Sequence, residues 1–171
     1  MGVHYNYDLA SGSLLQVWRG DFINVKNMWR GRGQEQSAVP LAETLEPGAA
    51  YNWQFLGGKR KAWPDSLLDA ENYRFKHYEL DKKGLPTFYY RYKGSEITDR
   101  LIPTESGLQR RIIVDRPAAG LWLALAKGSD IYQNEQGAYL VKEPGYILKI
   151  SEIEGLELLI REYEGHKELI A

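Results

Sequence analysis

The stretch YRFKHYELDKKGLPTFYYRYKGSEITDRL, Tyr73 to Leu101, decides the fold class of this chain. It opens with an aromatic, β-prone segment over residues 73–80, and Asp81-Lys82-Lys83-Gly84 then supplies turn residues, with glycine where a positive φ is needed. A second, alternating segment spans residues 85–92, and a third, shorter one spans residues 96–101. This pattern predicts a three-stranded antiparallel meander.

Short alternating segments separated by turn residues recur on both sides of the meander. Before it, the pattern predicts a hairpin of residues 3–8 and 14–20 and a further short strand over residues 21–25. After it, strands are expected at residues 108–114, 121–126, 131–133, 138–141, 146–150, 156–163 and 168–170. The last but one of these also fits helical spacing, but the glycines that bracket it favour a strand. Turns at this frequency are typical of a sandwich or barrel, so we predict an all-β, antiparallel β-sandwich with little helix.

One face of each alternating segment is apolar and is expected to supply the core. The expected core residues are Tyr7, Leu15, Val17, Phe75, Phe88, Tyr90, Ile112, Val114, Leu121, Leu123, Leu125, Leu148 and Leu158. One charged residue, Arg110, shares the apolar face of its segment with Leu108, Ile112 and Val114.

Bulk composition is that of an ordinary globular domain. The 171 residues suit a single domain, 1–171, and a content of 43% hydrophobic and 26% charged residues suffices for a sizeable core. The formal net charge of −1 gives no global attraction to nucleic acid or to anionic membranes. The absence of cysteine excludes disulfides, thiolate metal sites, covalent haem attachment and cysteine nucleophiles. We expect no cofactor and no metal, because His4, His77 and His166 lack the spacing of metal ligands.

Nothing in the sequence indicates insertion into a membrane or a leader segment. No apolar run approaches the length of a membrane helix, and no signal peptide precedes the first strand segment. Because Met1-Gly2 stands directly before a strand, we expect the domain to come from a longer chain.

The densest group of aromatic and polar residues lies in the N-terminal third. The candidate ligand-binding residues are Trp18, Arg19, Asp21, Trp29, Arg30 and Arg32. An indole face stacks on the C–H face of a sugar ring, while guanidinium and carboxylate groups hydrogen-bond to its hydroxyls. The alternative is that the two tryptophans are core residues and that the arginines lie along the rim of a sheet.

Other kinds of site have weaker support in the sequence. The basic runs at residues 30–32 and 59–61 suit single-stranded nucleic acid, but the negative net charge and the lack of a recognition motif argue against such a partner. A glycosidase needs two carboxyl groups about 5–10 Å apart. Asp8, Asp21 and Glu35 are the candidates, although 23 acidic residues make chance proximity common. No serine-hydrolase elbow, Walker motif or dinucleotide-binding motif is present.

Three stretches resemble a domain of large, exported, multidomain proteins of environmental bacteria. They are HYNYDLASGSLLQVWRGDFINVKNMWRGRG (residues 4–33), VPL (residues 39–41) and the meander segment quoted above. In that family the domain accompanies c-type cytochrome, sugar-dehydrogenase-like or sugar-hydrolase-like modules. The resemblance implies a β-sandwich, a periplasmic or extracellular setting and an association with sugar or redox enzymes. This chain has no Cys-x-x-Cys-His motif, so any haem belongs to a neighbouring module. The hairpin around Pro86-Thr87-Phe88 is also similar to the sandwich of galactose-mutarotase-like proteins, which is an analogy of fold alone.

Together these observations lead to three functional hypotheses. The first is a non-catalytic accessory domain that binds carbohydrate or docks onto a neighbouring enzyme domain. The second is a sugar-active enzyme, a hydrolase or mutarotase, that uses Asp21 or Glu35 as acid or base. The third is a purely structural module between domains.

Overall fold

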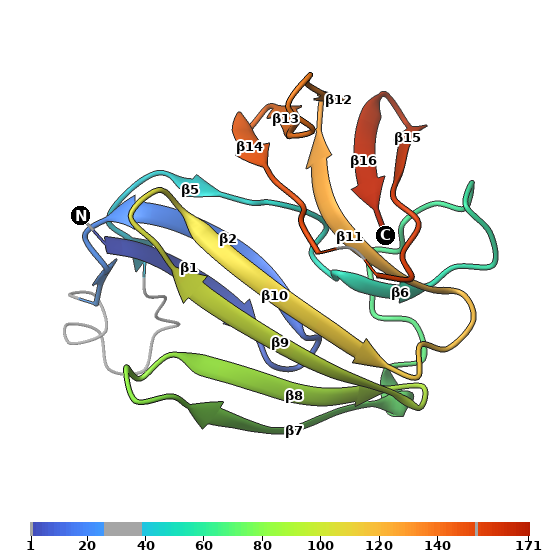
Figure 1. Cartoon of the computed structure of the whole chain (residues 1–171), viewed down its shortest axis with the longest axis horizontal. Helices are drawn as coiled ribbons and strands as arrows, with labels where there is room; N and C mark the ends of the chain where they lie inside the picture. Colours follow the sequence, from blue (N-terminus) through green and yellow to red (C-terminus); the bar gives the residue numbers. More distant parts are fainter. Residues whose placement is uncertain (1, 26–38, 153) are drawn as a thin grey trace, which may run out of the picture.

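The computed structural model describes residues 2–25, 39–152 and 154–171 (Figure 1). Its strands are β1 (Gly2–Asp8), β2 (Ser13–Gly20), β3 (Ile23–Asn24), β4 (Val39–Pro40), β5 (Thr44–Leu45), β6 (Trp53–Phe55), β7 (Tyr73–Leu80), β8 (Pro86–Tyr92), β9 (Ser95–Pro103), β10 (Leu108–Asp115), β11 (Leu121–Gly128), β12 (Asp130–Gln133), β13 (Tyr139–Lys142), β14 (Tyr146–Leu148), β15 (Leu159–Tyr163) and β16 (His166–Ile170). Within these ranges the helical structure consists of one 3₁₀ turn, Ala70–Asn72. The predicted all-β, antiparallel sandwich is therefore confirmed. None of the described residues belongs to a helix with the length and hydropathy that a bilayer crossing requires.

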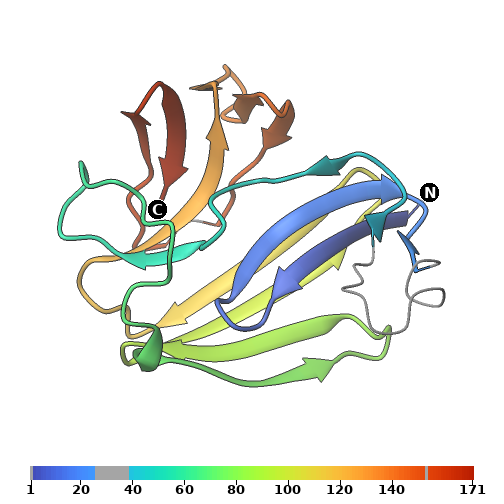
Figure 2. The same cartoon turned by 180° about the vertical axis from the view of Figure 1, so that it is seen from behind.

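Two sheets facing each other form what we call the main sandwich. One has the strand order β1-β2-β5 and the other β10-β9-β8-β7, and all their pairings are antiparallel. The predicted meander is β7 to β9, which β10 extends by one strand. Seen from behind, the β1–β2 hairpin lies across β9 and β10 (Figure 2). Contact between the sheets includes the stacked rings of Tyr7 and Phe88, with centroids 4.4 Å apart.

The alternation along β8 explains why its apolar face is buried. Phe88, Tyr90 and Tyr92 are 8%, 0% and 0% exposed, whereas Arg91 on the opposite face is exposed. Burial of each such side chain stabilises the fold by about 1.5–3 kcal/mol before conformational entropy is counted. The period of two in the sequence thus places these three rings in the core between the sheets.

The remaining strands form a second lobe. A four-stranded sheet of order β15-β16-β11-β6 carries the three-stranded sheet β12-β13-β14 beside it. The long strand β11 runs from the main sandwich up into this lobe (Figure 1). Leu125, in the middle of β11, packs against the buried residues of both parts. The interpretation of residues 156–163 as a strand is right from Leu159 onward.

A β-bulge corrects the predicted core of the first hairpin. Leu15 was expected inside, but it is only partly buried, whereas Leu14 is 6% exposed. Tyr7 pairs with Leu14 and Asn6 pairs with Gln16, so Leu15 is the unpaired residue of the bulge. An extra residue in one strand shifts the alternation, and a strict period of two therefore misassigns it.

A buried polar network crosses the main sandwich. Asp99 is 0% exposed, and Arg110 contacts it with Nη2 at 2.6 Å from Oδ2 and with Nε at 3.1 Å from each carboxylate oxygen. Tyr7 donates to Asp99 Oδ2 at 2.9 Å, and Arg110 Nη1 donates to Asn52 Oδ1 at 2.9 Å. Burial opposes the charge of Arg110, yet the adjacent carboxylate raises its pKa, and burial raises the pKa of Tyr7 and of Tyr90. The network ties β1, β9 and β10 to the segment before β6.

Candidate ligand groove

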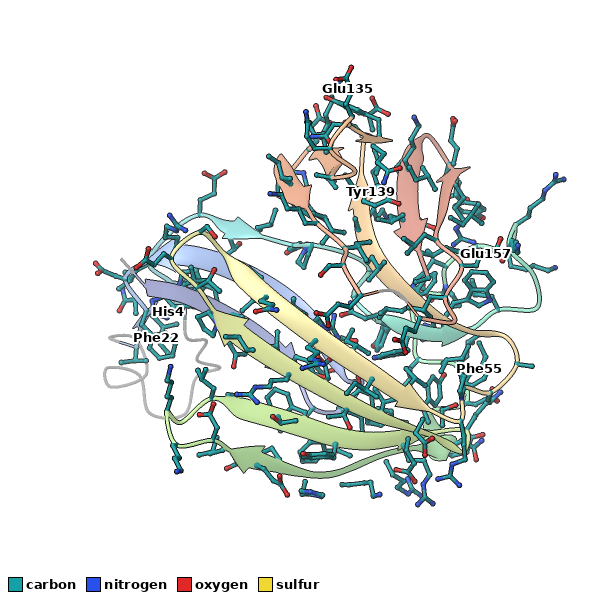
Figure 3. All side chains as sticks on the ribbon, viewed as in Figure 1. His4, Phe22, Phe55, Glu135, Tyr139 and Glu157 are labelled. Carbon is teal, nitrogen blue, oxygen red and sulfur yellow. The ribbon has the colours of Figure 1, made fainter. Side chains whose placement is uncertain are left out.

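Trp18, the first residue of the predicted site, is a packing group in the structure. It is 6% exposed, and its indole N–H donates to the carbonyl oxygens of Asp21 at 3.1 Å and Phe22 at 2.9 Å. The rings of His4 and Phe22 lie 5.6 and 6.3 Å from it, centroid to centroid. His4 and Phe22 cluster at the end of the molecule near the N-terminus (Figure 3). The indole faces are therefore covered by protein.

The other predicted site residues divide into two groups. Arg19 is exposed, and its Nη2 donates to the carbonyl oxygen of Glu105 at 2.6 Å, while Asp21 is exposed just after β2. Arg19 and Asp21 lie near Trp18 because they are close to it in sequence, and their side chains do not form a common site with it. The remaining candidates lie outside the described residues, namely Trp29, Arg30, Arg32 and the possible acid or base Glu35.

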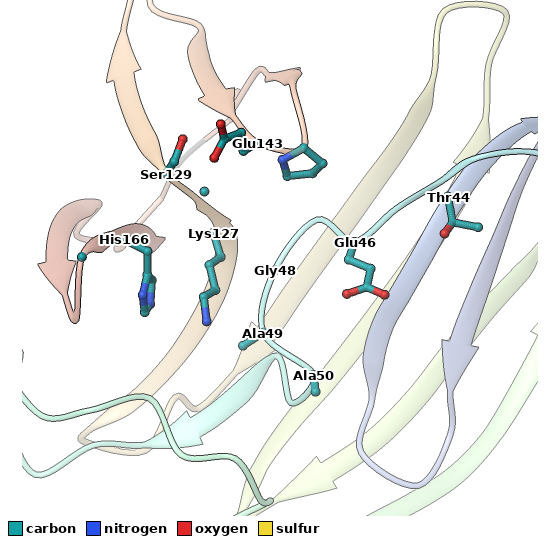
Figure 4. A pocket seen from close by; sticks show the side chains of 12 residues that line it. Thr44, Glu46, Gly48, Ala49, Ala50, Lys127, Ser129, Glu143 and His166 are labelled. Carbon is teal, nitrogen blue, oxygen red and sulfur yellow. The ribbon is translucent and has the colours of Figure 1, made fainter.

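A groove of about 870 Å³ lies between the main sandwich and the second lobe (Figure 4). It is open to solvent along its length. The side chains that line it and carry polar groups are Thr44, Glu46, Lys127, Ser129, Glu143 and His166. They come from β5 and the segment after it, from the end of β11 and the residue that links it to β12, from the β13–β14 turn and from the start of β16. A cleft where two parts of a fold meet is a common place for a ligand.

The segment between β5 and β6 is held against β11, and this sets one wall of the groove. Lys127 N donates to the carbonyl oxygen of Pro47 at 3.2 Å, and Ala124 N donates to that of Asn52 at 2.8 Å. The hydroxyl of Tyr146 donates to the same Pro47 oxygen at 2.5 Å, and burial raises the pKa of this phenol. Backbone groups at both ends of the segment are thus paired, which fixes its path across the lobe.

Glycine is required where β11 turns into β12. A Cβ atom on Gly128 would lie 2.4 Å from the carbonyl oxygen of Lys142 and 2.7 Å from Cγ1 of Val141. Only a residue without a side chain allows the end of β11 to approach β13 this closely. This approach places Lys127 and Ser129 at the edge of the groove.

Several groove side chains have no partner among residues 2–25, 39–152 and 154–171. Thr44, Glu46, Lys127 and Glu143 make no side-chain hydrogen bond or ion pair with any residue that the structure describes. His166 differs, because its Nε2 lies 3.1 Å from Oε1 of Glu168. Glu168 is buried, and its Oε2 accepts a hydrogen bond from Nε of Arg161 at 2.7 Å. The groove therefore combines free donors and acceptors with one imidazole held in place by a buried ion pair.

Sequence reasoning missed all of these residues. They are spread over four turns and strand ends between residues 44 and 166, where charged residues are ordinary. One signal was present in the sequence, because His166 and Glu168 alternate in a strand that ends with the apolar residues Leu169 and Ile170. Within the described ranges, no group of three histidine, aspartate or glutamate side chains is arranged to hold a metal ion.

Comparison with models of protein families, with curated proteins and with solved structures gave no match to this chain.

Proposed function

We propose that this protein is a non-catalytic module that binds a carbohydrate in the groove between the main sandwich and the second lobe. The observation that carries the proposal is the set of unpaired polar side chains around one hollow. Glu46 and Glu143 supply carboxylate acceptors, Lys127 supplies an ammonium donor and Thr44 supplies a hydroxyl. A sugar presents many hydroxyls that both donate and accept, and such mixed lining groups satisfy them.

The size and openness of the groove suit a short oligosaccharide bound weakly. Hydrogen bonds to exposed charged groups replace bonds to water, so their net contribution is modest. We expect a Kd of about 0.1–1 mM, which corresponds to about −4 to −5.5 kcal/mol. The exported setting suggested by the sequence resemblance is part of this proposal, and its support is that resemblance alone.

The proposal is tested by titrating the isotope-labelled protein with a panel of neutral and acidic oligosaccharides and following backbone amide resonances. Binding in the groove predicts shifts concentrated at Gly48, Gly128 and Gly165, which line it. The outcome that would contradict the proposal is an unchanged spectrum for every sugar up to about 10 mM, well above the expected Kd.

A matched pair of variants locates the site. Glu46→Ala removes a carboxylate that lines the groove, whereas Glu43→Ala removes an exposed carboxylate that lies just before β5 and outside the groove. We expect the first to weaken binding about three- to tenfold and the second to leave it unchanged, since one hydrogen bond in this open groove contributes a net of about 0.5–1.5 kcal/mol. Chromatography of the sugars after incubation checks that the protein binds them intact, and cleavage or isomerisation would favour the enzyme alternative instead.

A further inference from the structure

A row of charges crosses three strands of the second lobe and reaches the groove at Lys127, while Arg161 and Glu168 lie outside the lining of the groove. Arg161 of β15 pairs in register with Glu168 of β16, which pairs in register with Lys127 of β11. Partners in antiparallel strands share a face of the sheet, with Cβ atoms about 4.5–5.5 Å apart. His166, two residues from Glu168, lies on that face as well. The row has two cations around one carboxylate and therefore a positive excess.

Each carboxylate oxygen of Glu168, the acidic residue of this row, already has a partner. Its Oε2 accepts from Arg161 and its Oε1 contacts His166, and both Glu168 and Arg161 are buried, with side chains 6% and 8% exposed. Lys127 forms no ion pair with Glu168 or with any other described residue. No carboxylate in the part of the chain that the structure describes therefore compensates the charge of Lys127.

Two lysines on strands next to Lys127, namely Lys142 and Lys167, do have a carboxylate partner. Asp130 lies 2.7 Å from Nζ of Lys167 and 3.7 Å from Nζ of Lys142, so one carboxylate serves both of these lysines. Contact with Lys167 lowers the pKa of Asp130. Neither of those ion pairs includes Lys127.

Across the groove Glu46 supplies one carboxylate, whereas the other carboxylate of the lining, Glu143, belongs to the β13–β14 turn of the second lobe, on the same side as Lys127. Figure 4 shows His166 and Lys127 extending in the same direction from β16 and β11, with Glu46 on the facing β5–β6 segment. A ligand that satisfies both walls needs an anionic group on one edge and hydrogen-bond donors on the other. A hexuronate residue has this form, because its ring carries a carboxylate at one edge and vicinal hydroxyls at the opposite edge.

We infer that the groove is selective for acidic saccharides, with a uronate carboxylate held by Lys127 and His166 and the sugar hydroxyls directed to Glu46. This inference rests on the proposed carbohydrate-binding function and names its ligand class. The ammonium of Lys127 supplies the charge. The imidazole of His166 donates from Nε2 to Glu168, so its Nδ1 donates to the uronate carboxylate in the imidazolium form, in which both ring nitrogens carry a proton. Charge-assisted hydrogen bonds of this kind favour the acidic sugar over its neutral analogue by about tenfold.

The experiment compares pairs of trisaccharides that differ only in oxidation at C6. Trimers of galacturonate, glucuronate and mannuronate are titrated by calorimetry at low ionic strength, each beside the neutral hexose trimer. We expect at least one uronide to bind about tenfold more tightly than its neutral counterpart, and we expect about 0.5 M salt to remove that preference.

Two variants assign the preference to the groove. Lys127→Gln should bring the ratio of the two affinities to about 1, whereas Lys149→Gln, which removes an exposed lysine charge outside the groove, should leave it at about tenfold. If Lys127→Gln does not fold, amide shifts at Lys127 and His166 in the wild-type protein replace it, and their absence on addition of uronide would overturn the inference.

The possible failures are distinguishable. Equal binding of acidic and neutral trimers overturns the acidic selectivity and leaves the carbohydrate-binding proposal intact. Binding of neither class overturns both. A tenfold preference that survives in Lys127→Gln places the anion elsewhere and overturns the assignment of this subsite.

Discussion

The buried pair of Asp99 and Arg110 is the single-residue feature with the largest expected effect on stability. The carboxylate is completely buried and holds three groups, the guanidinium and the hydroxyls of Tyr7 and Tyr90. A buried ion pair gives little net stability relative to apolar residues, but removal of one partner leaves the other charge buried and unpaired. The energetic consequence of a substitution is therefore much greater than the value of the pair itself.

Asp99→Asn is expected to lower the free energy of unfolding by about 3–5 kcal/mol, because it leaves the charge of Arg110 buried without a counterion. Urea denaturation followed by circular dichroism measures the change. Asp115→Asn is the control, since that carboxylate is exposed and contacts only the neighbouring exposed Arg116, and it should cost at most about 0.5 kcal/mol. A loss below about 1 kcal/mol in Asp99→Asn would show that water or rearrangement compensates the guanidinium.

This pair was partly visible in the sequence. Arg110 interrupts an apolar face that also holds Leu108, Ile112 and Val114, and the structure places all four toward the core. A charged residue in such a position needs a buried partner. The sequence could not identify Asp99 as that partner, because the pairing depends on the register between β9 and β10, where Ile112 and not Arg110 stands opposite Asp99.

At the scale of elements, alternation predicted the strands well wherever a strand is regular. The first hairpin, the meander and β10 were each located within a few residues, because a sheet buried on one face imposes a period of two. The prediction failed at the bulge of Leu15, where one extra residue reverses the faces. The groove was not predictable for a related reason, since it arises from how turns remote in sequence meet, and no local pattern encodes that meeting.

The end of β11 is the element on which the groove depends most. Gly128→Ala is expected to lower the free energy of unfolding by about 1–3 kcal/mol, since the new methyl group overlaps the backbone of β13 and something must move. Chemical denaturation measures the loss, and the same variant should bind sugars more weakly because Lys127 is displaced. Gly57→Ala provides the comparison, because a Cβ atom added there would meet nothing within 4 Å and the change should be nearly neutral. Equal stabilities of the two variants would mean that β11 and β13 separate without cost.

At the scale of the whole molecule, buried tyrosine hydroxyls in both parts of the fold make its stability depend on alkaline pH. Burial is the leading cause that raises the pKa of Tyr92, to about 12, and it also raises the pKa of Tyr73 and Tyr90 in the main sandwich and of Tyr146 in the second lobe. An unfolded tyrosine ionises near pH 10. Above that pH the unfolded chain releases protons that the folded chain retains.

The contribution of these phenols to stability should therefore be constant below about pH 10 and should fall as the pH rises from about 10 toward 12, because the unfolded state binds fewer protons there. A spectrophotometric titration of tyrosinate, recorded with circular dichroism, should show the exposed phenols ionising first and the buried ones only as the structure unfolds. Tyr92→Phe removes one retained proton and should make the loss of stability with pH shallower, whereas Tyr132→Phe, at a residue that is 42% exposed, should not change it.

Because the main core and the second core share Leu125 on β11, both parts should unfold in the same transition. If all 12 tyrosines ionised in a single step near pH 10 with the native spectrum retained, the phenols would have to be accessible to solvent, and the packing of both cores described above would be wrong.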